Sequence, residues 1–271
     1  MEILPIKNLD DSDSLIFGSQ GVTLAKLKRL GLPVSDGIVV SAPDIHLKTA
    51  LEHYDFRNKE VFEQSLSLVK KEMAKVPISD ELVRETKKRN QFLVAGQTVK
   101  SAENLWLLLL DSWLDEIKKR LWEKGFIEGL TENLEAKIVI FPKKISAFGI
   151  GYFDQVLDET IVQIKNGRLE PSDLKKLDEI IKVANKKLLI PEEYEWILDG
   201  SIKLVGVKPF TPSVIPADAG IQPTKSDSKL DPRSSSLSEG LRVDDLRGDD
   251  KSAIKVFLDL SGPMPSGSSG L

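Results

Sequence analysis

A short polar turn framed by two glycines, Gly18-Ser19-Gln20-Gly21, stands directly before a stretch with helical spacing that ends at Leu30. Glycine lets backbone N–H groups approach an anion closely, and the start of a helix adds partial positive charge. Phosphate sites of this kind usually add a lysine or an arginine, whereas this turn offers Gln20. One interpretation is a phosphate-holding turn in which Gln20 contacts a nucleotide through its amide. The alternative is a tight turn before an ordinary helix, with Gln20 facing solvent.

A second group of polar side chains lies on two strand-like runs, "EYEWIL" and "SIKLVGVK". They are joined by Asp199-Gly200, a compact hairpin signal. Glu195 belongs to the first run and Lys208 ends the second. Opposite charges on neighbouring strands pair readily, so one interpretation is an ion pair of Glu195 with Lys203 or Lys208. A second interpretation is that Lys208 is a solvated charge on the surface of the sheet.

Composition excludes several kinds of site. The 271 residues include no cysteine, which excludes disulfides, thiolate catalysis and cysteine-ligated zinc. The two histidines, His46 and His53, have no partner cluster, so we expect no histidine metal site. A net charge of −4 gives no reason to expect nucleic acid as a partner. The N-terminus lacks a signal-peptide pattern and the apolar run Leu105 to Leu110 is too short to span a bilayer, so we expect a cytoplasmic protein with no membrane partner.

The first half of the chain is dominated by helical periodicity. We predict helices over about residues 22–30, 44–53, 59–75, 79–89 and 101–124. Ser79 and Ser101 are the expected N-caps of the last two, and Gly37 to Ser41 is a short buried strand. We expect the tryptophans of the longest helix to pack in a core rather than to stack on a base: Trp106, Trp113 and Trp122.

From residue 136 the pattern changes to short β-rich pieces separated by turn residues, with one helix over about residues 172–187. Helices first, and then an antiparallel sheet with a packed helix, predict an α+β fold rather than alternating βαβ units. We therefore expect an α-rich part over residues 1–135 and a β-rich part over residues 136–212.

The remaining sequence has a different character. Residues 213–252 are rich in proline, glycine, serine and aspartate without a sustained period, which predicts a disordered linker or an inserted repeat. "VIPADAGIQ" resembles the translation of a palindromic genomic repeat, which favours an insertion. Residues 253–271 open with a strand-like run, Ala253 to Gly262, and we expect no segment to pair with this truncated strand.

Two stretches, in the right order, resemble the phosphoenolpyruvate synthase and pyruvate phosphate dikinase family. "FGSQGVTLAKLKRLGLPVSDGIVVS" resembles the family's V-G-G-K-G-A-x-L-A-E-L and the following G-L-P-V-P-x-G-F-V-V-T. "IPEEYEWILDGSIKLVGVKPFTP" resembles P-x-D-I-E-W-A-x-D-G-x-L-x-I-L-Q-A-R-P-I-T. Between them the resemblance runs loosely through Gly96 and Gln97. The chain is similar to the N-terminal ATP-binding domain of that family, in truncated and degenerate form.

The resemblance implies an ATP-grasp-like fold with ATP between an α-rich N-terminal subdomain and a β-rich second one. It implies that Gln20, Gly21, Glu195 and Lys208 bind the cofactor, and that Glu195 helps to hold Mg²⁺. The family's phosphate-contacting lysine is Gln20 here, and the arginine of its Q-A-R element is Lys208. A compact ammonium does not replace a bidentate guanidinium, so phosphate binding is expected to be weakened.

The family transfers a phosphoryl group from ATP to a histidine and then to pyruvate, and the sequence setting of that histidine is missing here. Such transfer needs several cations around the triphosphate, which the matched positions no longer supply. We therefore expect no catalytic residue and no complete turnover by this chain alone. One hypothesis is a fragment that binds ATP weakly and works with a separate phosphohistidine-carrier chain. The other is a non-catalytic relic or interaction protein without nucleotide binding.

Overall fold

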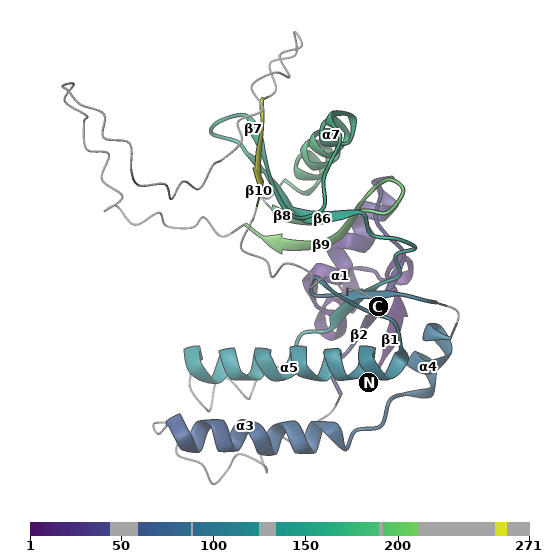
Figure 1. Cartoon of the computed structure of the whole chain (residues 1–271), viewed down its shortest axis with the longest axis vertical. Coiled ribbons are helices and arrows are strands. Elements are labelled where there is room, and N and C mark those ends of the chain that lie inside the picture. The colour runs from purple at the N-terminus through teal and green to yellow at the C-terminus, as the bar shows by residue number, and fades with distance from the viewer. Residues whose placement is uncertain (44–58, 88, 125–133, 190–191, 211–252, 259–271) are drawn as a thin grey trace, which may run out of the picture.

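Two five-stranded sheets and the helices that cover them make up the structure, a computed structural model (Figure 1). The layers follow one another from α7 (Pro171–Leu188) through the second sheet and α1 (Ser14–Arg29) to the first sheet, and then to α5 (Ala102–Lys124) and α3 (Lys59–Ala74). This arrangement confirms the α+β class. The described residues are 1–43, 59–87, 89–124, 134–189, 192–210 and 253–258.

The first sheet has the strand order β1-β2-β5-β3-β4, and its pairs are antiparallel. Each strand has three or four residues: β1 (Ile3–Pro5), β2 (Gly37–Val40), β5 (Lys137–Ile140), β3 (Phe92–Val94) and β4 (Gln97–Val99). The sequence predicts β2 and β5 but not the other strands, because three residues carry too little alternation to be recognised. β5 follows residue 135 in the chain and pairs with β2, so the first sheet draws strands from both sides of that position.

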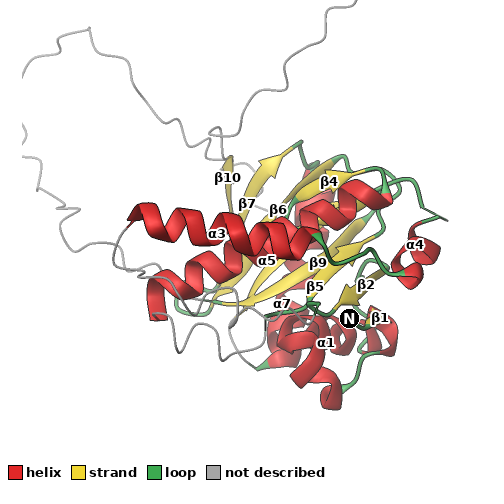
Figure 2. Ribbon diagram, turned by 90° about the horizontal axis from the view of Figure 1, so that it is seen from below, coloured by secondary structure: helices red, strands yellow, loops and turns green. Residues whose placement is uncertain are grey.

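Helices cover one face of the first sheet. Ile38 and Val40 pack in a core with residues of α3 and α5, whereas Val39, between them, packs in the core that contains α1. This alternation is what a strand buried on both faces requires. Figure 2 shows α3 and α5 side by side, and Lys70 of α3 pairs with Asp111 of α5 at 2.9 Å.

Two of the three tryptophans of α5 are core residues, as expected. Trp113 is fully buried and Trp106 is 7% exposed, and their rings meet edge to face at 6.1 Å. Each indole N–H donates to a backbone carbonyl, of Glu135 and Val76 respectively. Buried tryptophans with satisfied N–H groups contribute packing and leave no ring face for a base. The side chain of Trp122 lies outside the described residues.

The predicted N-caps of two helices are confirmed. The side chain of Ser79 accepts a backbone N–H at 3.1 Å at the start of α4 (Asp80–Thr86), and Ser101 does the same at the start of α5. Such caps satisfy N–H groups that have no partner within the helix. α4 ends earlier than the sequence predicts. The helix predicted over residues 44–53 lies outside the described residues.

α1 breaks at Gly18, which has φ 73° and ψ 162° inside an otherwise helical stretch. Two 3₁₀ turns, η1 (Ile6–Asn8) and η2 (Asp11–Asp13), lead into it. The expected four-residue turn is therefore wrong in extent, because Gln20 and Gly21 are already helical. One glycine at positive φ is enough to separate the two helical segments.

The second sheet has the order β10-β7-β6-β8-β9. Its strands are longer than those of the first: β10 (Ala253–Leu258), β7 (Glu159–Asn166), β6 (Ala147–Asp154), β8 (Glu192–Leu198) and β9 (Ile202–Pro209). The pairs among β6 to β9 are antiparallel, which agrees with the predicted antiparallel sheet. The predicted hairpin of β8 and β9 is confirmed, with Gly200 at φ 70° in its turn.

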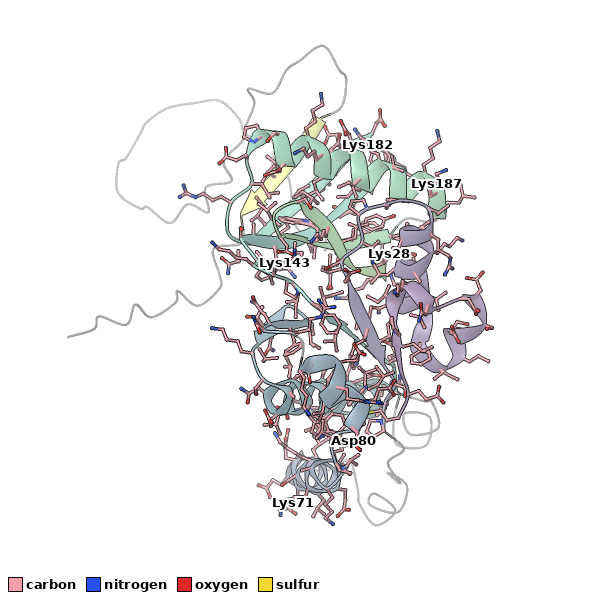
Figure 3. The ribbon with its side chains drawn as sticks, turned by 90° about the vertical axis from the view of Figure 1, so that its right-hand side faces the viewer. Lys28, Lys71, Asp80, Lys143, Lys182 and Lys187 are labelled. Carbon is pink, nitrogen blue, oxygen red and sulfur yellow. The ribbon has the colours of Figure 1, made fainter. Side chains whose placement is uncertain are left out.

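Helix α7 covers one face of this sheet and leaves the other face toward the first sheet (Figure 1). A Cβ at Gly151 of β6 would lie 2.7 Å from Ile181 of α7, so the backbone of this strand and the helix approach closely. Figure 3 shows Lys182 and Lys187 of α7 at one end of the molecule and Lys71 of α3 at the other. Because α7 covers only one face of the second sheet, side chains on its other face can line a site between the two sheets.

The expectation that the strand after residue 252 has nothing to pair with is wrong. β10 pairs in parallel with β7 over six residues, from Ala253 beside Glu159 to Leu258 beside Ile164. It adds to the edge of an existing sheet, so it is paired without any following segment. Residues 213–252, predicted to be disordered or inserted, lie outside the described residues.

Candidate functional site

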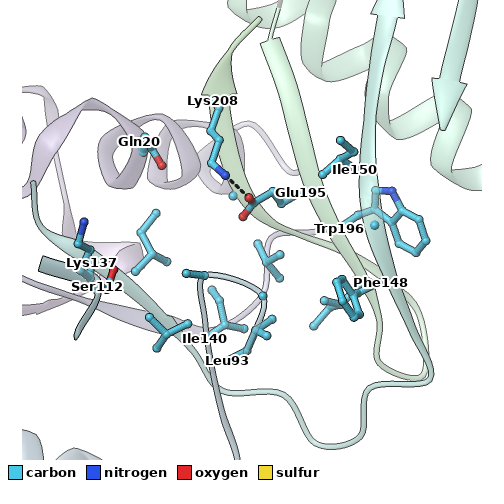
Figure 4. A pocket seen from close by; sticks show the side chains of 18 of the residues that line it. Gln20, Leu93, Ser112, Lys137, Ile140, Phe148, Ile150, Glu195, Trp196 and Lys208 are labelled. Carbon is cyan, nitrogen blue, oxygen red and sulfur yellow. Dashed lines mark hydrogen bonds and ion pairs between the residues drawn. The ribbon is translucent and has the colours of Figure 1, made fainter. Parts of the chain in front are cut away.

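A pocket of about 350 Å³ lies where the two sheets meet (Figure 4). From the first sheet it is lined by β5, by β3 and by the β3–β4 turn, and from the second by β6, β7, β8 and β9. Gln20 of α1 and Ser112 of α5 also line it. Its apolar side chains include Leu93, Ile138, Ile140, Phe148 and Ile150, and its charged ones are Glu135, Lys137, Lys165, Glu195 and Lys208. This combination of an apolar lining and a few polar groups is typical of a ligand pocket.

Glu195 and Lys208 form an ion pair across the β8–β9 hairpin (Figure 4). The Lys208 Nζ donates to Glu195 Oε1, and the side chains are 49% and 27% exposed respectively. The interpretation of a cross-hairpin pair is confirmed for Lys208, whereas Lys203 pairs with Asp199 at 3.0 Å. An ion pair this exposed contributes little to stability, but it neutralises both groups at the pocket.

Gly206 makes room for this carboxylate. It is the Cα partner of Glu195, and a Cβ at Gly206 would lie 2.3 Å from Glu195 Oε2 and 3.1 Å from Glu195 Cβ. The glutamate side chain therefore lies across the bare backbone of β9.

A second charged group stands on the first-sheet side of the pocket. Glu116 of α5 accepts from Lys137 Nζ at 2.5 Å, from Arg120 Nη2 at 2.5 Å and from the backbone N–H of Glu135 at 2.9 Å. The Glu116 and Arg120 side chains are each 13% exposed and that of Lys137 is 17% exposed. Because charges this far from solvent need partners, Glu116 fixes Lys137 at the pocket wall.

The hairpin that carries Glu195 and Lys208 is anchored at its turn by Asp199. Its carboxylate accepts from the backbone N–H groups of Lys144 at 2.9 Å and Lys143 at 3.3 Å, and from the Lys203 ammonium. Burial opposes ionisation of this group, but the three hydrogen bonds outweigh it and hold the pKa of Asp199 below its usual value. Asp199 therefore ties β9 to the segment that precedes β6.

Three of the four sequence-predicted site residues line the pocket together: Gln20, Glu195 and Lys208. Gly21 does not line it. A Cβ at Gly21 would lie 3.1 Å from Val39 and 3.3 Å from Leu9, so this glycine lets α1 pack closely against the first sheet. Gln20 lies far from Glu195 and Lys208 in the sequence. The fold brings Gln20 of α1 together with these two residues of the second sheet at the junction of the sheets.

Sequence reasoning missed Lys137 and Lys165. Both stand in runs recognised as strand-like, and strand alternation would have placed Lys165 on the same face as Ile161 and Gln163 of β7. Gln20 brings no charge to the pocket, whereas these two lysines supply charge from other strands. The pocket wall therefore carries three lysines, from β5, β7 and β9.

In the part of the chain that the structure describes, no three acidic or histidine side chains gather into a metal site. Glu195 offers one carboxylate, and one of its oxygens is taken by Lys208. Mg²⁺ takes six oxygen ligands and is commonly held by one or two carboxylates together with substrate phosphates. These residues therefore fit Mg²⁺ only when a nucleotide supplies most of the ligands. None of the described helices has the length and apolar character needed to cross a bilayer.

Comparison with known proteins finds distant structural likenesses. No family model and no curated protein sequence matches the chain. It is similar to the structure of Cdc123 from Schizosaccharomyces pombe, with 14% identity and a TM-score of 0.39, over 77% of this chain and 89% of that one. It is also similar to the biotin carboxylase subunit of pyruvate carboxylase, with 11% identity and a TM-score of 0.27, over 73% of this chain and 41% of that one. Because the TM-scores are low, we transfer no activity or ligand from these proteins.

Proposed function

We propose that the pocket between the two sheets is a nucleotide site that binds ATP weakly, and that this chain does not complete phosphoryl transfer on its own. The observation that carries the proposal is the convergence of Gln20, Glu195 and Lys208 on one pocket from two stretches far apart in the sequence. Both stretches resemble an ATP-binding domain in sequence. Two sheets with a pocket at their junction also agree with the ATP-grasp-like arrangement that the resemblance implies.

The lining suits the two ends of a nucleotide differently. Leu93, Ile140, Phe148 and Ile150 offer an apolar surface for a base, and the lysines offer charge for phosphates. Two of those lysines, Lys137 and Lys208, already have carboxylate partners. Phosphate binding must compete with these pairs, which supports weak affinity.

Mg²⁺ enters this proposal only together with ATP. Bound there, it would neutralise phosphate charge, with Glu195 as its protein ligand once that carboxylate is released from Lys208. Within the described part of the chain no histidine lines the pocket, and His46 and His53 lie outside that part. Because the sequence lacks the histidine motif of the family it resembles, a phosphohistidine carrier on a separate chain is the proposed partner for any transfer. A role in phosphoenolpyruvate synthesis is supported by the sequence resemblance alone.

The second candidate function is an interaction protein that binds no nucleotide. The Glu195–Lys208 pair favours it, because each group satisfies the other and neither needs a ligand. The two candidates differ in one measurable property, which is heat or stabilisation on adding Mg·ATP.

Calorimetry and thermal unfolding with Mg·ATP test the proposal. We expect a dissociation constant of about 1 mM, equivalent to about −4 kcal/mol. At a free ligand concentration about tenfold above that constant, the folded state gains about 1.4 kcal/mol. For a chain of this size each 1 kcal/mol raises the midpoint by about 2–4 °C, so the expected shift is measurable. Absence of both heat and shift at that concentration contradicts the proposal and supports the interaction protein.

A pocket-filling variant and a matched control locate the binding. Ile150→Trp adds bulk to a half-buried residue that lines the pocket, and we expect it to abolish the response to Mg·ATP. Ile161→Trp makes the same change on the same face of the second sheet, at a half-buried position outside the lining, and should leave binding intact. If both variants bind ATP like the original chain, the nucleotide binds elsewhere.

A further inference from the structure

Two β-bulges lie at the same level of the second sheet. Between β6 and β7, Phe148 pairs with Asn166 and Gly149 pairs with Ile164, which leaves Lys165 without a partner residue on β6. Gly149 also pairs with a residue of β8 that borders the second bulge. The two irregularities therefore flank the central β6–β8 pair on opposite sides.

The second bulge lies between β8 and β9. Glu195 pairs with Gly206 and Trp196 pairs with Leu204, which leaves Val205 as the extra residue. Both extra residues, Lys165 and Val205, line the pocket. Bulges bend a strand, re-aim a side chain and occur often beside functional sites. Two bulges at one level of the sheet, each contributing its extra residue to the same pocket, indicate that the sheet is shaped around this cavity.

Lys165 differs from the other lysines of the pocket in its partners. Lys137 is held by Glu116 at 2.5 Å, and Lys208 is held by Glu195. Lys165 is exposed, and among the residues that the structure describes it has no carboxylate within ion-pair distance. An anion entering the pocket can therefore contact Lys165 without displacing a carboxylate, whereas contact with either of the other two lysines requires an ion pair to open.

We propose that Lys165 is the primary anion-binding residue of the pocket and that its ligand is a polyphosphate group. The bulge supplies the position, and the lack of a carboxylate partner among the described residues leaves the charge available. For the triphosphate of a nucleotide the inference depends on the proposed function, whereas for the polyphosphate group itself it does not. Gln20, which stands where the related family has its phosphate lysine, is then a neutral neighbour of the ligand rather than its anchor.

Titration of the full chain with three probes tests this assignment: sodium tripolyphosphate, ATP and adenosine, each at low ionic strength. We expect Lys165→Gln to weaken tripolyphosphate and ATP by about tenfold, since one charge-assisted contact at an exposed site is lost. Adenosine binding should not change. Lys165→Arg keeps the charge and should retain most of the affinity. The control is Lys175→Gln, at an exposed lysine of α7 on the covered side of the sheet, which should behave like the original chain.

The outcomes separate the two proposals. If Lys165→Gln and Lys175→Gln bind tripolyphosphate and ATP equally well, the assignment of Lys165 is wrong, while ATP binding by the original chain still supports the nucleotide site. If the original chain binds tripolyphosphate through Lys165 but shows no adenosine or Mg·ATP binding, the anion site holds and the nucleotide site fails. If no probe binds, both are overturned. Because Lys165 is exposed, these substitutions should not affect folding, which unfolding curves of each variant verify.

Discussion

Gly206 lies directly beside Glu195 on the neighbouring strand, and the absence of a Cβ at Gly206 is what lets the Glu195 carboxylate reach Lys208. A Cβ built there would lie 2.3 Å from Glu195 Oε2, a distance that no real contact shows. The relationship is local and steric. A larger residue at position 206 would disturb the Glu195–Lys208 ion pair at the pocket wall, which can be tested by substitution.

Gly206→Ala is expected to displace the Glu195 carboxylate and break its pair with Lys208. The nearest atom is the end of a flexible side chain, so we expect a modest loss of stability, about 1 kcal/mol. Released from its partner, Lys208 should bind anions more strongly, by about threefold for tripolyphosphate. Chemical denaturation measures the first effect and calorimetry the second. Unchanged anion affinity in a folded variant would show that the pair does not control Lys208.

Gly149→Ala is the steric counterpart within the same sheet. A Cβ at Gly149 would lie 2.1 Å from the carbonyl oxygen of Gln163 and 2.7 Å from the buried Trp196 ring. Neither a strand backbone nor a packed indole can move freely, so we expect a loss of about 3 kcal/mol, well above that of Gly206→Ala. Urea unfolding of the two variants compares their losses of stability. Equal losses would contradict the close packing of Gly149 against Gln163 and Trp196.

Glu195→Gln separates the metal role from the ion pair. Removing the carboxylate frees Lys208, so binding of ATP without metal should strengthen by about threefold. If Glu195 also ligates Mg²⁺ carried by ATP, the added benefit of Mg²⁺ should fall. Calorimetry with and without Mg²⁺ measures both. A variant whose Mg²⁺ dependence matches that of the original chain would exclude Glu195 as a metal ligand.

The hairpin turn should make stability depend on pH through Asp199. Its pKa is lowered in the folded chain, so its contribution is present in full above the ordinary value of 3.8 and is lost as the pH falls through the lowered pKa. Asp199→Asn should cost about 2 kcal/mol at neutral pH, because three donors lose a charged acceptor, and should flatten the acid limb of the stability curve. Denaturation series at neutral pH and in acid measure this, and an unchanged acid limb would count against the role.

The β3–β4 turn offers a stabilising change. Ala95 has φ 47° and Gly96 has φ 79°, the pattern of a two-residue hairpin turn that favours glycine or asparagine. Ala95→Gly relieves a left-handed alanine and should stabilise the chain by about 0.5–1 kcal/mol, whereas Gly96→Ala should destabilise it. Midpoints of urea unfolding test both signs. A loss of stability in Ala95→Gly would mean that the turn has another conformation.

The sequence predicts the longer elements well and the short strands poorly, for a physical reason. α5 and α7 carry several turns of amphipathic spacing and β8 and β9 carry a turn signal, so each is recognisable locally. β1, β3 and β4 have three residues each and exist because the first sheet pairs them. β10 depends likewise on the edge of β7, a partner that no local pattern reveals.

The site was predicted in the same uneven way. Gln20, Glu195 and Lys208 were found because two motifs resemble a known family, and the fold places all three on one pocket. Gly21 was chosen for a ligand and instead packs against Val39. Lys165 carries no motif. Alternation along β7 indicates its face, but the bulge that leaves it without a partner residue on β6 appears only when β6 and β7 are paired.

Photo-crosslinking with azido-ATP, followed by mapping of the labelled peptides, tests the central claim most directly. We expect label in peptides that contain the residues lining the pocket, which are 20, 93–96, 112, 135–138, 140, 148–150, 165, 195–197, 205, 206 and 208, and competition by unlabelled ATP. We also expect Ile150→Trp to remove this label while Ile161→Trp keeps it. Label confined to other segments, or label that unlabelled ATP does not displace, would contradict a nucleotide site between the two sheets.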